Sequence, residues 1–182
     1  MNIVAIDPSL TCTAVVINDK KFIYAKEDYG VSEKSGNLKK WFSLCEPFIT
    51  YRWVNHDSSI VHSESEILKH LSYDRLASKI VSDILVEIDP TMPTVIGIEG
   101  FSYSSLAGPL IDLVTLQTLL RSMILLKITS NVKIYAPAEL KLMAAKLTYE
   151  PIITGVKVKK YTYKNNEGIA GGSFKKPDIY KA

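Results

Sequence analysis

The chain has 182 residues, 47% of them hydrophobic and 23% charged, the length and composition of a single soluble globular domain spanning 1–182. Its net charge of +3 neither demands nor excludes nucleic acid, but residues 151–182 carry seven lysines against two acidic residues. We therefore expect a basic arm at about 148–174 that suits a polyanion, although a solvated tail would give the same count. Cys12 and Cys45 form no CxxC pair, which argues against a disulfide framework and a structural zinc site.

Membrane insertion is not expected from the sequence. No basic segment precedes the first apolar run, so the N-terminus does not resemble a secretory signal. The longest apolar run, 110–127, is interrupted by Asp112, Gln117 and Arg121, which favours a buried helix over a membrane span. These features predict a cytoplasmic protein.

The first part of the chain predicts an antiparallel meander. Residues 2–6, 11–18 and 21–26 are short apolar or β-branched runs joined by short links. The first run ends at Asp7-Pro8, because proline cannot extend a strand ladder. The stretch 28–65 is less regular, and we expect an insertion there with some strand in it.

Helices and strands then alternate. Between 66 and 88 apolar residues recur every fourth position, which predicts an amphipathic helix. The apolar run 94–100 predicts a strand covered on both faces. The helix expected at 109–127 is apolar around most of its circumference, so it needs two partners, the sheet and a second subunit. A strand at 131–136 and a helix at 137–146 follow.

Past residue 148 the pattern loosens. The segment VKVKKYTYK alternates at period two before the turn signal NNEG, which predicts a small hairpin or ordered arm. FKKPDIYKA resembles the start of one more helix. The order is βββ-α-β-α-β-α, an α/β mixed sheet with helices on its faces.

Asp7 and Glu99 each end a strongly apolar strand. If the first and fourth strands are parallel neighbours, these carboxylates meet at one end of the sheet and repel unless a cation lies between them. Hard Mg²⁺ suits such oxygen ligands, and metal-activated water attacks phosphodiesters. Gly100 removes a side chain where a phosphate backbone would approach. An Asp before Pro also commonly starts a turn, so a structural role for Asp7 stays open.

Five segments carry a resemblance to one family. IVAIDPSLTCTAVVI, VIGIEGFSYS, GPLIDLVTLQTLLRSMIL, IYAPAELKLMAAK and FKKPDIYKA resemble, in order, successive segments of RuvC-type Holliday junction resolvases. The match covers most of the chain apart from 28–65 and 147–170, and the long insertion suggests a divergent branch of viral or phage origin. The resemblance implies a ribonuclease H-like mixed five-stranded sheet with helices on both faces.

The same resemblance assigns roles. It implies a metal-dependent endonuclease that cuts branched DNA such as a four-way junction, with Asp7 and Glu99 as ligands of Mg²⁺ or Mn²⁺, and a homodimer through the helix 109–127. Residues implied to contact DNA are the aromatic wedge Phe101 or Tyr103, and the lysines Lys141, Lys175 and Lys176. The alternative is that the aromatic rings pack under their loop and the lysines contact nothing in particular.

One feature departs from the family pattern. Family members end in a helix with two aspartates about one turn apart, whereas here only Asp178 is present near Ala182. We expect the C-terminal helix to be truncated, with further acids beyond Ala182. On that expectation the 182-residue form binds branched DNA but cleaves it poorly.

Other functions compete with this one. An actin-like ATPase would need a second glycine-rich phosphate loop and about twice this length. A non-catalytic DNA-binding or scaffolding paralogue would keep the fold without a complete acid set. Another nuclease of the same fold would act on RNA–DNA hybrids or flaps. Nuclease assays on a four-way junction with Mg²⁺ separate the enzyme from the silent paralogue.

Overall fold

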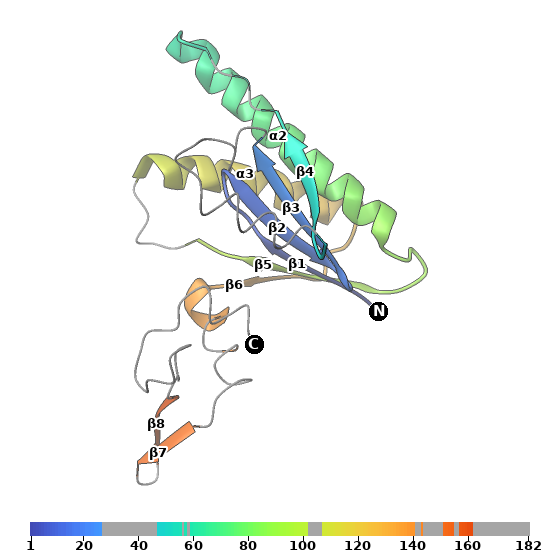
Figure 1. The fold of residues 1–182 in the computed structure, drawn as a ribbon, viewed down its shortest axis with the longest axis vertical. Coiled ribbons are helices and arrows are strands. Elements are labelled where there is room, and N and C mark those ends of the chain that lie inside the picture. Colours follow the sequence, from blue (N-terminus) through green and yellow to red (C-terminus); the bar gives the residue numbers. More distant parts are fainter. Residues whose placement is uncertain are drawn as a thin grey trace. The chain divides into compact units, whose positions relative to one another are not determined.

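The computed structural model contains a six-stranded mixed sheet (Figure 1). The structure describes residues 1–26, 47–55, 57, 59–101, 107–140, 143, 151–154 and 157–161. The chain divides into two compact units, Met1–Ile134 and Tyr135–Ala182. Each unit is described by itself.

Four strands of this sheet precede the first long helix, and helices and strands alternate after them. In order they are β1 (Asn2–Asp7), β2 (Cys12–Ile17), β3 (Lys20–Lys26), β4 (Thr50–Val54), α2 (His62–Glu87), β5 (Thr94–Glu99), α3 (Ala107–Lys127) and β6 (Val132–Tyr135). The strand order across the sheet is β4-β3-β2-β1-β5-β6. The element types predicted from periodicity are confirmed for these ranges, and α2 begins four residues earlier than expected.

The predicted meander is present. β1 pairs with β2, and β2 with β3, both antiparallel. The turn between β2 and β3 places Asn18 at a φ of 53°, a left-handed conformation that asparagine tolerates better than most residues. The Asn18 side chain accepts a hydrogen bond from the backbone N–H of Ile3 at 2.9 Å, which joins the turn to β1.

The sheet has one strand more than the five predicted. β4 comes from the stretch 28–65, where we expected an insertion with some strand, and it pairs in parallel with β3 at the edge of the sheet. The fourth predicted strand, β5, pairs in parallel with β1. The expectation that the first and fourth strands are parallel neighbours is therefore confirmed.

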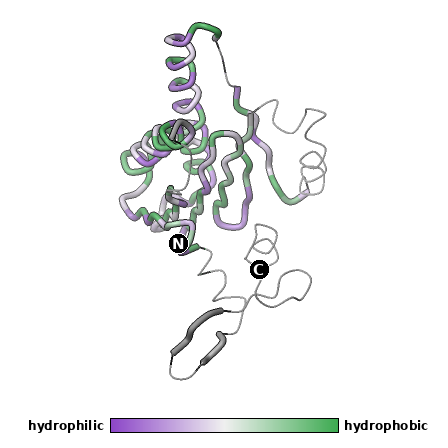
Figure 2. The backbone as a smooth tube through the Cα atoms, turned by 90° about the vertical axis from the view of Figure 1, so that its left-hand side faces the viewer, coloured by the Kyte–Doolittle hydropathy of each residue, from purple (hydrophilic) through white to green (hydrophobic). Residues whose placement is uncertain are grey.

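Both long helices pack on the same face of the sheet (Figure 1). Alternate strand residues and one side of each helix share a single core, because side chains alternate across a strand and recur every third or fourth position along a helix. Its members include Val4, Ile6, Val15, Ile17, Ile96, Ile98, Leu76, Ile80, Ile84, Leu116, Leu120 and Ile124. In Figure 2 hydrophilic and hydrophobic residues alternate along α2, as in an amphipathic helix.

The prediction of helices on both faces is thus not met by α2 and α3. In β1 the residues Ile3, Ala5 and Asp7 are exposed, while Asn2, Val4 and Ile6 between them are buried. Within the described residues of the first unit, no helix covers this second face, which we call the open face. Helix periodicity marks the apolar side of a helix but not the side of the sheet on which it packs.

The second unit contains a short helical segment and a hairpin among its described residues. Residues 137–140 are helical, and the Glu139 carboxylate accepts a hydrogen bond from the Ala136 N–H at 2.9 Å, as expected for an acid in the first turn. β7 (Pro151–Thr154) pairs antiparallel with β8 (Lys157–Tyr161). A hairpin is therefore present in the basic arm, but β8 pairs with the segment before it, and NNEG lies outside the described residues.

Candidate metal and nucleic-acid site

Two carboxylates end neighbouring parallel strands. The register of β1 and β5 pairs Ile6 with Ile98, so the next residues, Asp7 and Glu99, lie opposite each other at the strand spacing of about 4.8 Å. Both belong to the open face, where Asp7 is exposed and Glu99 is partly buried. The structure therefore brings together the two acids that the sequence singled out.

Asn2 fixes this register from the other end of the strands. It is 2% exposed, and its side-chain amide donates to the Thr94 hydroxyl at 3.1 Å and to the Asp89 carbonyl at 2.8 Å. The Asp89 N–H donates back to the Asn2 side-chain oxygen at 3.1 Å. Because Asn2 and Thr94 are register partners, this contact aligns Asp7 with Glu99 five residues further on.

The loop after Asp7 is held by a reciprocal hydrogen-bond pair. The Thr13 hydroxyl donates to the Ser9 carbonyl at 2.8 Å and accepts from the Ser9 N–H at 3.1 Å. Thr13 is fully buried, so the loop between β1 and β2 is fixed to the core side of β2. A fixed loop keeps the Asp7 backbone in one place.

The acidic pair has no third partner of the same kind within the described ranges. No group of three or more His, Cys, Asp or Glu residues that could hold a metal occurs among them. Asp178, the late acid noted in the sequence, lies outside the described residues, as do Tyr103, Lys141, Lys175 and Lys176. Their predicted roles stay predictions.

Phe101, two residues past Glu99, contacts a cation. The Arg121 guanidinium of α3 lies 5.0 Å from the centre of the Phe101 ring, a cation–π contact. Phe101 is partly buried, and Arg121 covers one face of its ring. If Phe101 stacks on a base, as the resemblance implies, only the other face of the ring is available without displacing Arg121.

Arg121 is an unusual residue in the middle of a largely apolar helix. It donates to the buried Gln117 side chain one turn earlier, while its Nε atom is buried with no hydrogen-bond partner. Burial lowers the pKa of Arg121, because a charge loses solvation there. The sequence contained a signal for this pair, because Gln117 and Arg121 interrupt the apolar run 110–127.

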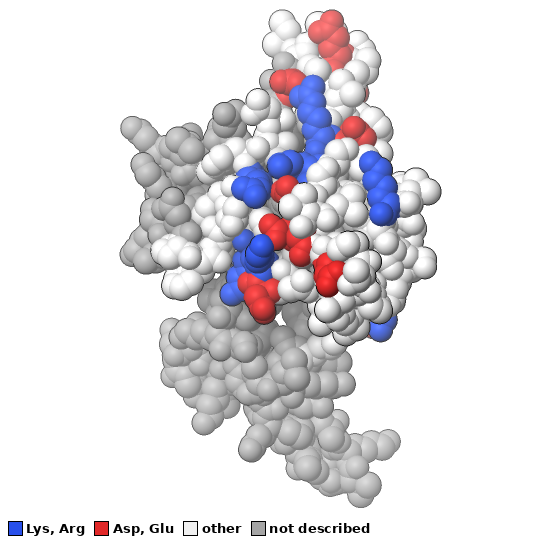
Figure 3. All heavy atoms as spheres, turned by 90° about the vertical axis from the view of Figure 1, so that its right-hand side faces the viewer, with Lys and Arg blue, Asp and Glu red and all other residues white. Residues whose placement is uncertain are grey.

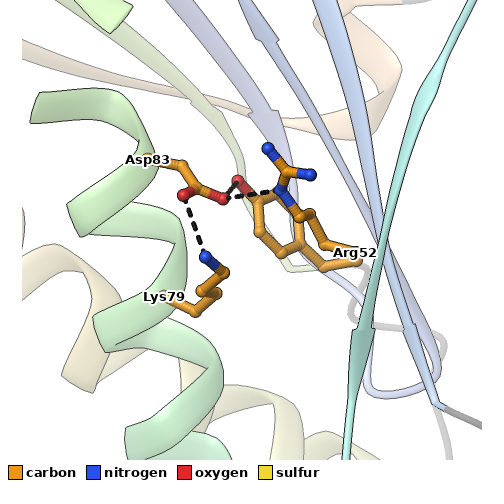
Figure 4. A network of polar contacts seen from close by, with 4 residues as sticks. Arg52, Lys79 and Asp83 are labelled. Atoms are coloured by element: carbon orange, nitrogen blue, oxygen red, sulfur yellow. Dashed lines mark hydrogen bonds and ion pairs between the residues drawn. The ribbon is translucent and has the colours of Figure 1, made fainter. Parts of the chain in front are cut away.

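A second polar cluster lies on the helix side of the sheet (Figure 4). Asp83 of α2 accepts hydrogen bonds from the Tyr24 hydroxyl at 2.9 Å and from Arg52 Nε at 3.3 Å. Lys79, one turn before it, approaches the other Asp83 oxygen at 3.1 Å. One carboxylate therefore joins α2 to both β3 and β4. Sequence periodicity did not identify this cluster.

The charges on the β4 and α2 side are balanced. Figure 3 shows basic and acidic side chains next to one another on this side, without a large area of one sign. Ion pairs join Lys20 to Glu87 and Arg75 to Asp57 in the same region. Such pairs neutralise each other among the described residues of this side.

Comparisons with known proteins identify no family for the chain. No family model matches it, and no curated protein matches it either. Its function is therefore proposed from its own residues and fold.

Proposed function

We propose that this protein is a metal-dependent endonuclease that cuts branched DNA, in the manner of RuvC-type Holliday junction resolvases. The observation that carries the proposal is the alignment of Asp7 and Glu99 at the ends of the parallel neighbours β1 and β5. Acidic pairs of this kind bind hard divalent cations, which are the usual cofactors of phosphodiester cleavage.

The topology supports a ribonuclease H-like fold. An antiparallel β1–β2–β3 meander followed by a strand parallel to β1 is the arrangement that the family resemblance implies. β4 extends the outer edge of the meander without changing the order of the strands inside it. The acidic pair lies at the ends of two interior strands of this sheet.

The residues at the site fit a magnesium or manganese ion. Both donors are carboxylates, the ligand type that hard cations prefer, and two neighbouring carboxylates repel each other unless a cation lies between them. Asp7 and Glu99 would hold this ion. When bound, it would polarise a phosphate oxygen and lower the pKa of a water molecule. Gly97 and Gly100, near Glu99, leave room for a DNA backbone.

We also propose a symmetric dimer through α3. By length and hydropathy alone this helix could cross a membrane, with 22% of its apolar window buried. One of its sides packs in the core, while another exposes apolar and hydroxyl side chains at helical spacing. These are Ile111, Val114, Thr118, Ser122 and Leu125, which we call the α3 stripe.

The α3 stripe is self-complementary about its middle. In an antiparallel pair centred on Thr118, Ile111 lies opposite the partner's Leu125, and Val114 opposite the partner's Ser122. The small hydroxyl residues at the centre allow close approach of the two helices, and the larger side chains at the ends fill the space on either side. A two-fold dimer also provides two acidic pairs, which suits paired nicks in a four-way junction.

The decisive test is Asp7→Asn in the full chain. We expect the protein to bind Mn²⁺ in calorimetric titrations and to nick a four-way junction weakly in Mg²⁺, with Asp7→Asn weakening metal binding and abolishing the weak nicking. Junction binding should survive, because the variant removes a negative charge near phosphate. Asp19→Asn, the same change in an exposed turn, is the control and should behave as wild type.

Two results would contradict the proposal in different ways. Junction binding without nicking, and without metal binding, would favour the non-catalytic DNA-binding paralogue. Nicking that survives in Asp7→Asn would remove Asp7 from the site.

A further inference from the structure

Two aromatic residues of β4 lie on the open face. Tyr51 and Trp53 alternate with Arg52 along the strand, and Arg52 points to Asp83 on the helix side (Figure 4). Tyr51 and Trp53 therefore belong to the opposite side of the strand. Their ring centres are 6.1 Å apart with an interplanar angle of 16°, a stacked pair. Trp53 is 49% exposed.

The aromatic pair and the acidic pair share this face. The register pairs Asp7 with Ala14, Ala14 with Ile23, and Ile23 with Tyr51. Tyr51 therefore stands in the same row across the sheet as Asp7, three strand spacings away. At about 4.8 Å per spacing this distance is about 14 Å.

Four residues of β2 and β3 lie between the two pairs, and all of them are partly or fully buried. Ala14 and Ile23 separate Asp7 from Tyr51, and in the neighbouring row Cys12 pairs with Ala25, which pairs with Trp53. Ala25 is 2% exposed, whereas Ala14 and Ile23 are partly buried, so a ligand that joins the two pairs would follow the row of Ala14 and Ile23 across β2 and β3. Lys21, the register partner of Val16, is exposed on the same face and supplies a positive charge beside this path.

The Asp83 cluster holds the aromatic pair in this position. Tyr24 and Arg52 are register partners, and both donate to the same Asp83 carboxylate. A slip of one residue would turn Arg52 to the open face and the aromatic rings into the core. The cluster therefore selects the register in which the rings face the side that carries Asp7.

We infer that Tyr51 and Trp53 form a stacking platform for a base of a single-stranded DNA segment whose backbone reaches Asp7 and Glu99. This inference rests on the proposed nuclease function and adds to it a second contact with the substrate. Stacking on aromatic rings is tolerant of sequence, because every base has a π-face. At about 3.4 Å per stacked nucleotide, about 14 Å places the stacked base roughly four nucleotides from the acidic pair, or fewer in an extended strand.

The first test uses tryptophan emission. The chain has two tryptophans, Trp41 and Trp53, so in Trp41→Phe the emission reports Trp53 alone. We expect a saturable loss of this emission when oligo-dT is added to the full chain in the presence of Ca²⁺. Unchanged emission while the oligonucleotide binds, measured by anisotropy of a labelled strand, would overturn the inference.

The second test compares variants. Trp53→Ala should weaken oligo-dT binding about 5- to 100-fold, the range for one lost base–aromatic stack, whereas Trp53→Phe should recover most of the affinity. The matched control is Val86→Ala, a truncation at a 79% exposed position of α2, which should leave affinity unchanged. Equal affinities for all four proteins would overturn the inference.

A third test uses oligo-dT strands that each carry one abasic nucleotide, at a different position in each strand. It distinguishes the loss of one stacked base from a general loss of protein structure in Trp53→Ala. In wild type, one position should weaken binding as much as Trp53→Ala does, and in Trp53→Ala that position should have no further effect. If the metal and Asp7→Asn results hold but no abasic position matters, the platform is wrong and the nuclease function stands. If no DNA binds at all, both are wrong.

Discussion

Asn2 shows how a single residue far from the acidic pair controls its alignment. Its side chain contacts residues 87 to 92 positions away in the sequence, at the start of β5. The contact with Thr94 is buried and those with Asp89 and Met92 are partly buried, so they are more costly to lose than the same bonds in water. Hydrogen bonds of Asn2, in addition to apolar packing, therefore stabilise the parallel register of β1 and β5.

We predict that Asn2→Ala destabilises the protein. The substitution leaves the Asp89 N–H and nearby carbonyls without their Asn2 partner in a partly buried position, at a cost of about 1–3 kcal/mol. Urea unfolding followed by circular dichroism measures this cost, and Mn²⁺ affinity should fall at the same time because the acids lose their alignment. Asn131→Ala, at an exposed position, should change stability by less than about 0.5 kcal/mol; equal losses in the two variants would contradict the role of Asn2.

Tyr24 makes stability depend on pH in the alkaline range. Burial, together with the hydrogen bond to Asp83, raises the pKa of Tyr24 well above its usual value. The phenol therefore keeps its proton in the folded protein at a pH where the unfolded chain has lost it. Its contribution to stability is complete below the ordinary tyrosine pKa of about 10 and is lost as the pH rises from there toward the folded pKa.

We predict that the free energy of unfolding falls more in wild type than in Tyr24→Phe between pH ~8 and pH ~11. The extra loss is about 1 kcal/mol, because the upper pH lies about one unit above the ordinary tyrosine pKa. Urea unfolding of both proteins at the two pH values measures the difference, and titration of the other tyrosines and of lysines is common to both. Parallel losses would show that Tyr24 titrates normally.

At the scale of elements, β4 depends on a charged cluster for its attachment. It is an edge strand with one sheet neighbour, β3, and its polar link to α2 runs through Arg52 and Asp83. The Asp83 side chain is 13% exposed, whereas the Lys79 side chain is 48% exposed. The Arg52 side chain is 37% exposed, so water screens the two ion pairs of this carboxylate to similar degrees, and the hydrogen bond from the hydroxyl of the buried Tyr24 is the further contact on the strand side.

We predict that Asp83→Ala destabilises the protein by about 1.5–3 kcal/mol, the range for hydrogen bonds to a charged group, because Tyr24 and Arg52 lose their acceptor. Lys79→Ala should cost less than about 1 kcal/mol, since an exposed partner contributes little. Hydrogen exchange adds a local readout, in which β4 amides lose protection in Asp83→Ala. Intact β4 protection in that variant would show that the strand is held by other contacts.

At the scale of the whole molecule, α3 exposes apolar side chains that do not pack in the core of a single chain. Leu116, Leu120 and Ile124 are at most 1% exposed, whereas Ile111 is 66% and Leu125 52% exposed. Exposed apolar side chains in a row at helical spacing are typical of a protein–protein contact. The proposed dimer would bury them against their own copies.

We predict that Val114→Lys gives a monomer at micromolar concentration where wild type is a dimer, because a charge at the α3 stripe would be buried without a partner. Light scattering coupled to size exclusion measures the mass. Val86→Lys, the same change on the exposed side of α2, should leave the dimer intact. A wild-type monomer under these conditions would remove the α3 stripe as an interface.

The sequence by itself determined the local elements and the two acids. Short apolar or β-branched runs predicted β1, β2 and β5, and the spacing of four residues between Leu76, Ile80 and Ile84 predicted α2. The strand ends at Asp7 and Glu99 identified the candidate site. These features depend on neighbours within a few residues, which is the range over which periodicity carries information.

Only the tertiary structure decided how the elements are paired and covered. The addition of β4 to the meander, the packing of α2 and α3 on one face and the register set by Asn2 all depend on contacts between residues distant in the sequence. The open face, which brings Tyr51 and Trp53 into line with Asp7, results from the same pairing. A periodic pattern states which side of an element is apolar, but the partner of that side is chosen by the burial and polar contacts of the whole fold.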